Sequence, residues 1–329
     1  MKKIIIPLLF VAIIMCGGLL WWNYVKGPVD VEEKNVPFLI TRGSSASKIA
    51  SMLEEKGLVK SSLAFKFYIQ LTGVAGKIQA GEYTLSPNDS LLKTVAKLLS
   101  GPEERWVTIP EGLRREEVAE KFADSLQKED KNAFIQEFMT LSKGKEGYLF
   151  PDTYIFPKEA TANTIVNKMI SIFESKYSDE IEKGLLKNSL TQEEGVILAS
   201  ILERETLGES EKPIVAGILL NRLKSDWPLQ ADATVQYAAG TLRCANKYTG
   251  CKWWEPVTKA DLEIKSSFNS YKNIGLPPSA IASPGISSLK AVANAQDTEY
   301  WFYLHDPKGE IHYAKTLEEH GANINRYLR

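Results

Sequence analysis

The clearest amphipathic pattern in the chain runs from Thr191 to Thr206. Thr191 can cap a helix, and Glu194, three residues later, completes a capping box. At about 100° per residue, four positions of this segment fall on one stripe of the helix. Three are apolar and the last is a carboxylate: Leu198, Ile201, Leu202 and Glu205. The pattern therefore predicts a helix that carries a carboxylate at the end of its buried face.

The position of Glu205 suggests a chemical role. Burial disfavours the charged form of a carboxylate and raises its pKa, as a general acid working near neutral pH requires. Glu203 lies roughly 160° away around the same helix, so the two acids cannot share a face. Alternatively, Glu205 simply emerges into solvent from a frayed last turn. Helix geometry alone leaves both interpretations open.

An uncharged run from Ile4 to Trp22 stands near the start of the sequence, just after Lys2 and Lys3. Such a run is just long enough to cross a bilayer core, and the lysines before it predict a cytoplasmic N-terminus. We predict a cytoplasmic tail at 1–3, a single-pass helix at 4–22 in the bacterial inner membrane, and a linker at 23–35. The rest of the chain is then periplasmic or otherwise extracytoplasmic.

Two other interpretations of this run involve Cys16. A signal peptide could be cleaved near Cys16-Gly17-Gly18, but the apolar run continues past that point. A lipoprotein site at Cys16 fits less well still, because the residues before it are large. We favour the uncleaved anchor.

Residues 36–127 alternate between strand and helix patterns. A strand, a glycine turn and an amphipathic helix occur at 38–53 and recur at 106–126. Two weakly similar units fit a small α+β module of the sort that binds glycan chains. Generic α+β packing explains the pattern equally well, since such units are common.

Residues 128–329 are predicted to be mainly helical. A helix over 128–145 precedes an aromatic and proline-rich segment, 146–157, that is too broken by proline for a helix. After the central helix come turns rich in polar side chains, in which Asp232 can cap a short helix. A hairpin formed by 300–304 and 310–313, and a helix capped by Thr316, close the chain. The predicted fold class is α+β.

Composition excludes several classes of function. The chain has 329 residues, 44% of them hydrophobic and 25% charged, which is typical of a folded protein of two or three domains. Its 40 basic and 41 acidic residues give a net charge of −1, so nothing suggests a nucleic-acid partner. The 3 His and 3 Cys have no zinc-like spacing, and we expect neither a metal site nor a cofactor.

The cysteines predict one disulfide. An extracytoplasmic location and a short spacing favour a bond between Cys244 and Cys251, while Cys16 should have no partner. Two free thiols remain the alternative, because sequence does not fix the distance between Cα atoms.

Six short motifs occur in order along the chain, and together they resemble a known family. They are Glu146-Gly-x-Leu-Phe-Pro-Asp-Thr-Tyr, Ala199-Ser-Ile-x-Glu-x-Glu-Thr206, Asn221-Arg-Leu, Leu229-Gln-x-Asp, Asn269-x-Tyr and Gly275-Leu-Pro-Pro-x-x-Ile-x-x-Pro-Gly285. Along essentially its whole length the chain resembles the membrane-anchored endolytic murein transglycosylases, the YceG-like family. The resemblance implies an anchor, a LysM-like glycan-binding module at 36–127, and a mainly helical, lysozyme-like catalytic domain at 128–329.

The resemblance also implies an activity. Such enzymes cleave peptidoglycan glycan strands between N-acetylmuramic acid and N-acetylglucosamine and leave a 1,6-anhydromuramyl end, which would terminate or trim nascent strands. The second Glu of Glu-x-Glu-Thr, here Glu205, is then catalytic. Its neighbour Thr206 is similar to the serine of the Glu-Ser pair in other lytic transglycosylases. A peptidoglycan synthase is a possible partner. The chain departs from the family at Ala233, where proline is frequent, and in the loop 244–251, which looks like an insertion.

Four polar residues on turns after the central helix are candidates for binding substrate and supporting positive charge on the sugar: Gln230, Asp232, Asn269 and Tyr271. Capping and turn roles fit each of them as well. Two other functions stay open. One is a non-catalytic peptidoglycan-binding scaffold. The other is a muramidase that uses water, with Asp232 or Glu203 as the second carboxylate.

Overall fold

The computed structural model describes residues 15–41, 43–102, 104–158, 160–245 and 247–328. The chain divides into two compact units. Unit 1 comprises the described residues up to Trp106 together with Tyr154–Lys158, and unit 2 comprises Val107–Thr153 and the described residues from 160 onward. The division falls inside two strands that pair with each other, β3 (Glu104–Thr108) and β4 (Thr153–Pro157).

Unit 1 is a small α+β body built on an antiparallel pair of strands. Strands β1 (Val36–Ile40) and β2 (Gly81–Leu85) pair with Phe38 opposite Tyr83. The remaining elements are α2 (Ala46–Glu55), α3 (Ser62–Leu71), η1 (Ala75–Lys77) and α4 (Leu91–Ser100). The three α-helices are capped by the side chains of Ser45, Ser61 and Ser90, and their apolar faces enclose a core with Phe38 and Phe65.

The predicted tail, 1–3, and residues 4–14 of the predicted span lie outside the described residues. Residues 15–25 are helical. Within the part of the chain that the structure describes, no helix is both long enough and apolar enough to cross a bilayer.

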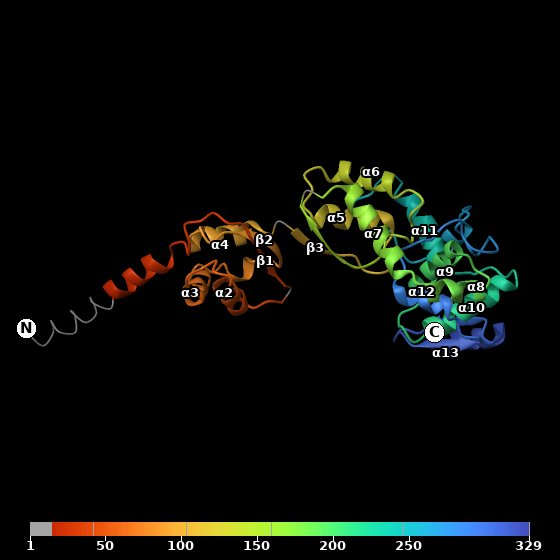
Figure 1. Cartoon of the computed structure of the whole chain (residues 1–329). Helices are drawn as coiled ribbons and strands as arrows, with labels where there is room; N and C mark the ends of the chain where they lie inside the picture. The colour runs from red at the N-terminus through yellow and green to blue at the C-terminus, as the bar shows by residue number, and fades with distance from the viewer. Residues whose placement is uncertain (1–14, 42, 103, 159, 246, 329) are drawn as a thin grey trace, which may run out of the picture. The chain divides into compact units, whose positions relative to one another are not determined.

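Unit 2 holds most of the helices (Figure 1). Its helices are α5 (Arg115–Ser125), α6 (Lys131–Leu141), α7 (Ala162–Lys176), α8 (Asp179–Lys187), α9 (Gln192–Glu205), α10 (Lys212–Lys224), α11 (Asp232–Arg243), η2 (Asp261–Glu263), α12 (Ile286–Ala293) and α13 (Leu317–Tyr327). Its hairpin pairs β5 (Phe302–His305) with β6 (Ile311–Ala314). The predicted α+β class is confirmed, and so is the C-terminal hairpin. Strand β4 was missed, because Pro151 shortly before it and Pro157 at its last position obscure its alternation.

Helix α9 is the centre of unit 2. The capping box of Thr191 and Glu194 starts it as predicted, and helices α8, α10, α11 and α12 pack around it. It is buried on every side from Gly195 to Leu202, rather than along the single stripe that the sequence suggested. A methyl group added at Gly147 would lie 2.7 Å from Val196 on α9, so the Glu146-Gly147 turn must carry glycine to pack there.

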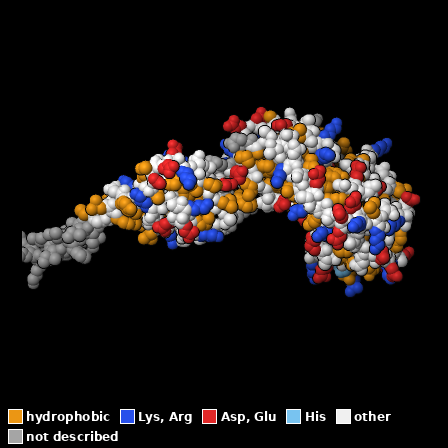
Figure 2. Space-filling view, viewed as in Figure 1, with side chains coloured by type: hydrophobic (Ala, Val, Ile, Leu, Met, Phe, Trp, Pro, Cys, Tyr) orange, Lys and Arg blue, Asp and Glu red, His pale blue; other side chains and the backbone are white. Residues whose placement is uncertain are grey.

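On the face shown in Figure 2, acidic and basic side chains of unit 2 are interspersed and form no extended patch of one sign. This mixture matches the nearly neutral composition of the whole chain.

Candidate active site

Glu205 is the last residue of α9, and its side chain reaches a cleft of about 420 Å³. The cleft is lined by Glu205, Arg222, Gln230, Asp232, Tyr271, Phe302, Tyr303, Leu304, His305, Leu317 and His320. The residues before Glu205 on its stripe are fully buried, so α9 leaves the core at this point. The last turn of α9 is therefore ordered, and it holds the Glu205 carboxylate at the wall of a cleft rather than in open solvent.

Each oxygen of Glu205 accepts one hydrogen bond. The backbone N–H of Ala233 donates to Oε1 at 3.2 Å, and the Tyr303 hydroxyl donates to Oε2 at 2.9 Å. Burial raises the pKa of Glu205 above its usual value, and the charge of Asp232 raises it further. The two hydrogen bonds and the nearby guanidinium of Arg222 act in the opposite direction, but burial dominates. Glu205 thus has the environment of a proton donor.

The start of α11 brings backbone donors to Glu205. Ala231 is the N-cap and Asp232 is the first helical residue, so the predicted capping role of Asp232 is wrong. The methyl side chain of Ala231 cannot accept a hydrogen bond, and the carboxylate of Glu205 accepts from the N–H of Ala233 in its place. The positive end of the helix dipole favours an anion at this position.

Gln230 precedes this helix in a left-handed backbone conformation, with φ of 49°. Its N–H donates to the carbonyl of Ser270 at 3.1 Å, which fixes the turn, and its exposed side chain lines the cleft. A non-glycine residue in this conformation is strained, and such strain is frequent at functional sites.

Tyr271 and Asp232 meet at the cleft. The Tyr271 hydroxyl donates to Oδ1 of Asp232 at 2.6 Å, which joins the loop after η2 to the start of α11. Burial and the neighbouring Asp232 carboxylate raise the pKa of Tyr271, so its hydroxyl stays a donor. Of the four predicted substrate-binding residues, Gln230, Asp232 and Tyr271 are brought together here.

Asn269 does not line the cleft. It is fully buried, and its amide donates to the carbonyls of Leu262 and Ile264 at 2.9 and 3.0 Å. Its carbonyl oxygen accepts from the N–H of Tyr271. This placement does not support direct contact of Asn269 with substrate, and the residue instead shapes the loop that carries Tyr271.

Two neighbours of Glu205 point elsewhere. The Thr206 hydroxyl donates to the carbonyl of Leu202 at 2.7 Å. Glu203 accepts from Gly285 N–H and Ser288 Oγ and forms an ion pair with Lys212. These partners meet Glu203 because α12 begins beside this face of α9.

The C-terminal elements supply cleft residues that sequence reasoning missed. Tyr303 lies on β5, and His320 lies on α13, where its ring stacks on Phe302 at 5.1 Å. The Arg222 guanidinium donates to the carbonyls of Leu229 and Trp301, which fixes the walls around Glu205. The hairpin itself was predicted, but no local pattern indicated that it would face the end of α9.

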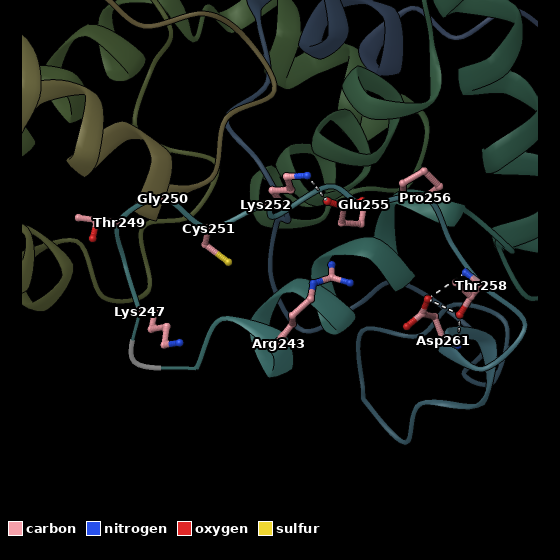
Figure 3. Close-up of a pocket in the computed structure, with 10 residues that line it drawn as sticks. All are labelled: Arg243, Lys247, Thr249, Gly250, Cys251, Lys252, Glu255, Pro256, Thr258 and Asp261. Atoms are coloured by element: carbon pink, nitrogen blue, oxygen red, sulfur yellow. Dashed lines mark hydrogen bonds and ion pairs between the residues drawn. The ribbon is translucent and has the colours of Figure 1, made fainter.

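A second pocket lies at the loop after α11 (Figure 3). Cys244 and Cys251 form a disulfide there, with Cα atoms 6.1 Å apart, and Cys16 is free. Arg243 and Lys247 point toward this pocket, while Glu255 pairs with Lys252 and Asp261 is held by Thr258. None of the pocket's residues lines the cleft of Glu205.

One group of side chains has the types and spacing of metal ligands. Among the described residues, Asp306, Glu310 and His312 bring three potential ligand atoms within 4.8 Å of one another. The Asp306 carboxylate already accepts from two backbone N–H groups and lies 3.3 Å from His312 Nε2, while the His312 ring stacks on Tyr327. The tight turn of the hairpin therefore explains why these three side chains lie close together.

Comparison with known proteins identifies the family. The model of the YceG-like family matches residues 38–326 of the chain. The chain belongs to the YceG-like family. The matched range includes all the residues that line the cleft.

Relatives of this YceG-like protein cover nearly all of its chain. It is 31% identical to an endolytic murein transglycosylase of Bacillus subtilis, over 96% of this chain and 91% of that protein. It is 28% identical to one of Streptococcus pneumoniae, over 98% of this chain but 64% of that protein. A crystal structure of a yceG-like protein from Listeria monocytogenes matches with a TM-score of 0.60 and 28% identity, over 88% of this chain and 98% of that one.

Proposed function

We propose that this protein is an endolytic lytic transglycosylase that cleaves peptidoglycan glycan strands. The observation that carries the proposal is the carboxylate of Glu205, which burial keeps protonatable at the wall of a polar cleft. The relatives named endolytic murein transglycosylase support the substrate class.

The reaction needs one acid and no water. The protonated Glu205 gives its proton to the glycosidic oxygen while the bond from that oxygen to C1 of N-acetylmuramic acid breaks. The sugar's own C6 hydroxyl attacks C1, and its proton passes to the carboxylate of Glu205. The product carries a 1,6-anhydro ring, and Glu205 is protonated again. Because the nucleophile belongs to the substrate, little entropy is lost in bringing it to C1.

Asp232 and Tyr271 suit the developing positive charge on the sugar. The Tyr271 hydroxyl holds the Asp232 carboxylate at the cleft wall, and an oriented carboxylate stabilises a nearby oxocarbenium-like centre. Gln230 offers an exposed amide on the same wall for sugar hydroxyls.

A muramidase that uses water is the second candidate function, and the position of Asp232 is the observation that favours it. A second carboxylate in the cleft could activate water, as glycosidases with two acids do. Glu203 is a poor candidate for that role, since both of its oxygens already have partners.

The test is to incubate the full chain in detergent with purified glycan strands and analyse the new ends. We expect 1,6-anhydromuramyl ends, and we expect Glu205→Gln to release none. Reducing ends alone would indicate the muramidase. Tight binding of strands without any product would indicate a non-catalytic scaffold.

We further propose that residues 4–22 anchor the protein in the inner membrane with the catalytic domain outside. The uncharged run and the lysines before it support this orientation. Protease added to spheroplasts should then degrade the catalytic domain. A mature N-terminus near Leu19 would contradict the anchor.

A LysM-like, glycan-binding role for residues 36–127 is also a proposal. Helix α3 presents the aromatic ring of Phe67, which is 55% exposed and could stack on a sugar. With Glu205→Gln as background, Phe67→Ala should weaken sedimentation of the full chain with insoluble peptidoglycan. The exposed Leu92 on α4 provides a control, Leu92→Ala, and equal loss in both variants would contradict the role.

The proposed partner is a peptidoglycan synthase in the same membrane, since an enzyme that terminates nascent strands must work where they are made. Cross-linking in cells should recover such a synthase with the full chain. Failure to recover one at native expression would count against the partnership.

A further inference from the structure

The two oxygens of Glu205 have chemically different partners. Oε1 accepts from the backbone N–H of Ala233, a group that can only donate. Oε2 accepts from the Tyr303 hydroxyl, a group that can donate or accept. A proton on Oε1 would weaken the hydrogen bond from a donor that cannot turn away, because a protonated oxygen is a poorer acceptor. The Tyr303 hydroxyl can turn and accept, so Oε2 is the better site for the proton of the neutral acid.

We infer that Tyr303 is a positioning residue for the catalytic acid: its hydroxyl holds the proton-bearing oxygen Oε2 of Glu205 and donates to it once the proton has left. The inference rests on the proposed function. When Glu205 is neutral, the tyrosine hydroxyl turns so that Oε2–H can point at the glycosidic oxygen. When Glu205 is ionised, the hydroxyl donates to Oε2. Tyr303 keeps its own proton throughout, and the proton from the C6 hydroxyl of the sugar returns to Oε2.

Among the described residues, Tyr303 is the side chain that forms a hydrogen bond to Glu205. In the described structure, the hydrogen bonds to Glu205 come from Ala233 and Tyr303. Other charged or titratable groups act on Glu205 through space or share its cleft, and they are Arg204, Arg222, Asp232, Tyr271, His305 and His320. Burial and the Glu205 carboxylate raise the pKa of Tyr303 well above its usual value, so the hydroxyl stays protonated at any pH of interest.

The strand that carries Tyr303 keeps the hydroxyl in place. Tyr303 is the second residue of β5 and lies opposite Tyr313 on β6, and both rings pack against the core of unit 2. A hydrogen bond to an ionised acceptor is roughly twice as strong as one between neutral groups. The contact of Tyr303 therefore strengthens as Glu205 loses its proton, and this favours the transition state over the bound substrate.

The test compares Tyr303→Phe with the wild-type full chain on glycan strands over a range of pH. We expect kcat to fall about ten- to hundredfold, with KM little changed, because one charge-assisted hydrogen bond is lost in the transition state. The Tyr303 donor lowers the pKa of Glu205. Its removal should therefore move the alkaline limb of the kcat profile to higher pH, since the acid then stays protonated longer.

Tyr313→Phe is the matched control, because Tyr313 faces Tyr303 across the hairpin and does not line the cleft. Its kcat and pH profile should equal those of the wild type. A Tyr303→Phe variant with wild-type kcat, or with reduced kcat and an unmoved alkaline limb, would overturn the inference. Melting temperatures show whether either variant is misfolded.

If the wild type itself releases no 1,6-anhydro ends, the proposed function fails. If the wild type is active and only the Tyr303→Phe result fails, Tyr303 is not the positioning residue.

Discussion

Two carboxylates in the last turn of α9 have opposite surroundings. Glu203 faces the start of α12, where Gly285 N–H, Ser288 Oγ and the Lys212 ammonium use both of its oxygens. Glu205 faces the cleft, where a backbone N–H and a tyrosine hydroxyl hold it without any direct ion pair. The contacts of Glu203 join α9 to Lys212 on α10 and to the start of α12, which gives Glu203 a structural role. The absence of an ion pair among the described contacts of Glu205 leaves it free to exchange a proton.

The largest expected effect concerns activity. Glu205→Gln preserves the shape of the side chain but has no proton to deliver, so kcat should fall by about 10²- to 10⁴-fold. Circular dichroism and the melting temperature should stay close to the wild type, since no cavity forms. Retention of more than a tenth of the wild-type kcat would remove Glu205 from the reaction.

Glu203→Gln should affect stability more than activity. It breaks a pair in which the Lys212 side chain is only 5% exposed, while Lys212 keeps Glu209 and Ser287 as partners. We therefore expect a loss of about 1–3 kcal/mol in the free energy of unfolding. Turnover by the folded protein should remain substantial. Glu209→Gln is the control, because Glu209 pairs with the same lysine but is 69% exposed and should cost less than about 1 kcal/mol. An inactive but fully stable Glu203→Gln variant would make Glu203 the catalytic residue and would contradict its structural role.

Glu146 shows that a raised pKa alone does not make a catalytic acid. Burial raises its pKa to about 8, yet Glu146 does not line the cleft and is held by Arg115 N–H and the Tyr237 hydroxyl. Glu146 therefore binds a proton more tightly in the folded state than in the unfolded state, where its pKa has the ordinary value of 4.5. This group's stabilisation is fully present below about 4.5 and is lost as the pH rises through about 8.

Glu146→Gln should accordingly reduce the loss of stability between pH 5 and pH 8.5, by about 1 kcal/mol or more. Denaturant unfolding of both proteins at the two pH values measures the difference. The alkaline limb of the activity profile should stay where it is in the wild type. If the alkaline limb moved in Glu146→Gln, then Glu146, and not the cleft residues, would set the pKa that governs activity.

Ala233→Pro should give the smallest effect. Residue 233 is in the first turn of α11, where proline is tolerated, and the change removes only the N–H that donates to Oε1 of Glu205. Because that donor lowers the pKa of Glu205, the alkaline limb should move to higher pH while the melting temperature changes little. An unmoved limb in an intact protein would show that the Ala233 contact is unimportant in solution.

The sequence predicted the local features of this site well. The capping box of Thr191 fixed where α9 begins, and its phase placed Glu205 away from Glu203. Local patterns could not show that Tyr303, 98 residues further along, donates to Glu205, because such a contact depends on how distant elements pack. The same limit explains why the sequence did not show that Asn269 lies away from the cleft, with its buried amide donating to carbonyls of its own loop.

The central claim is that Glu205 alone serves as acid and base while the substrate supplies the nucleophile. The most direct measurement is to digest glycan strands in water enriched in heavy oxygen and determine the mass of the new muramic ends. Wild type and Glu203→Gln should both yield ends that lack one water and carry no heavy oxygen. Ends that contain heavy oxygen would contradict the claim and make Asp232 the second carboxylate of a muramidase.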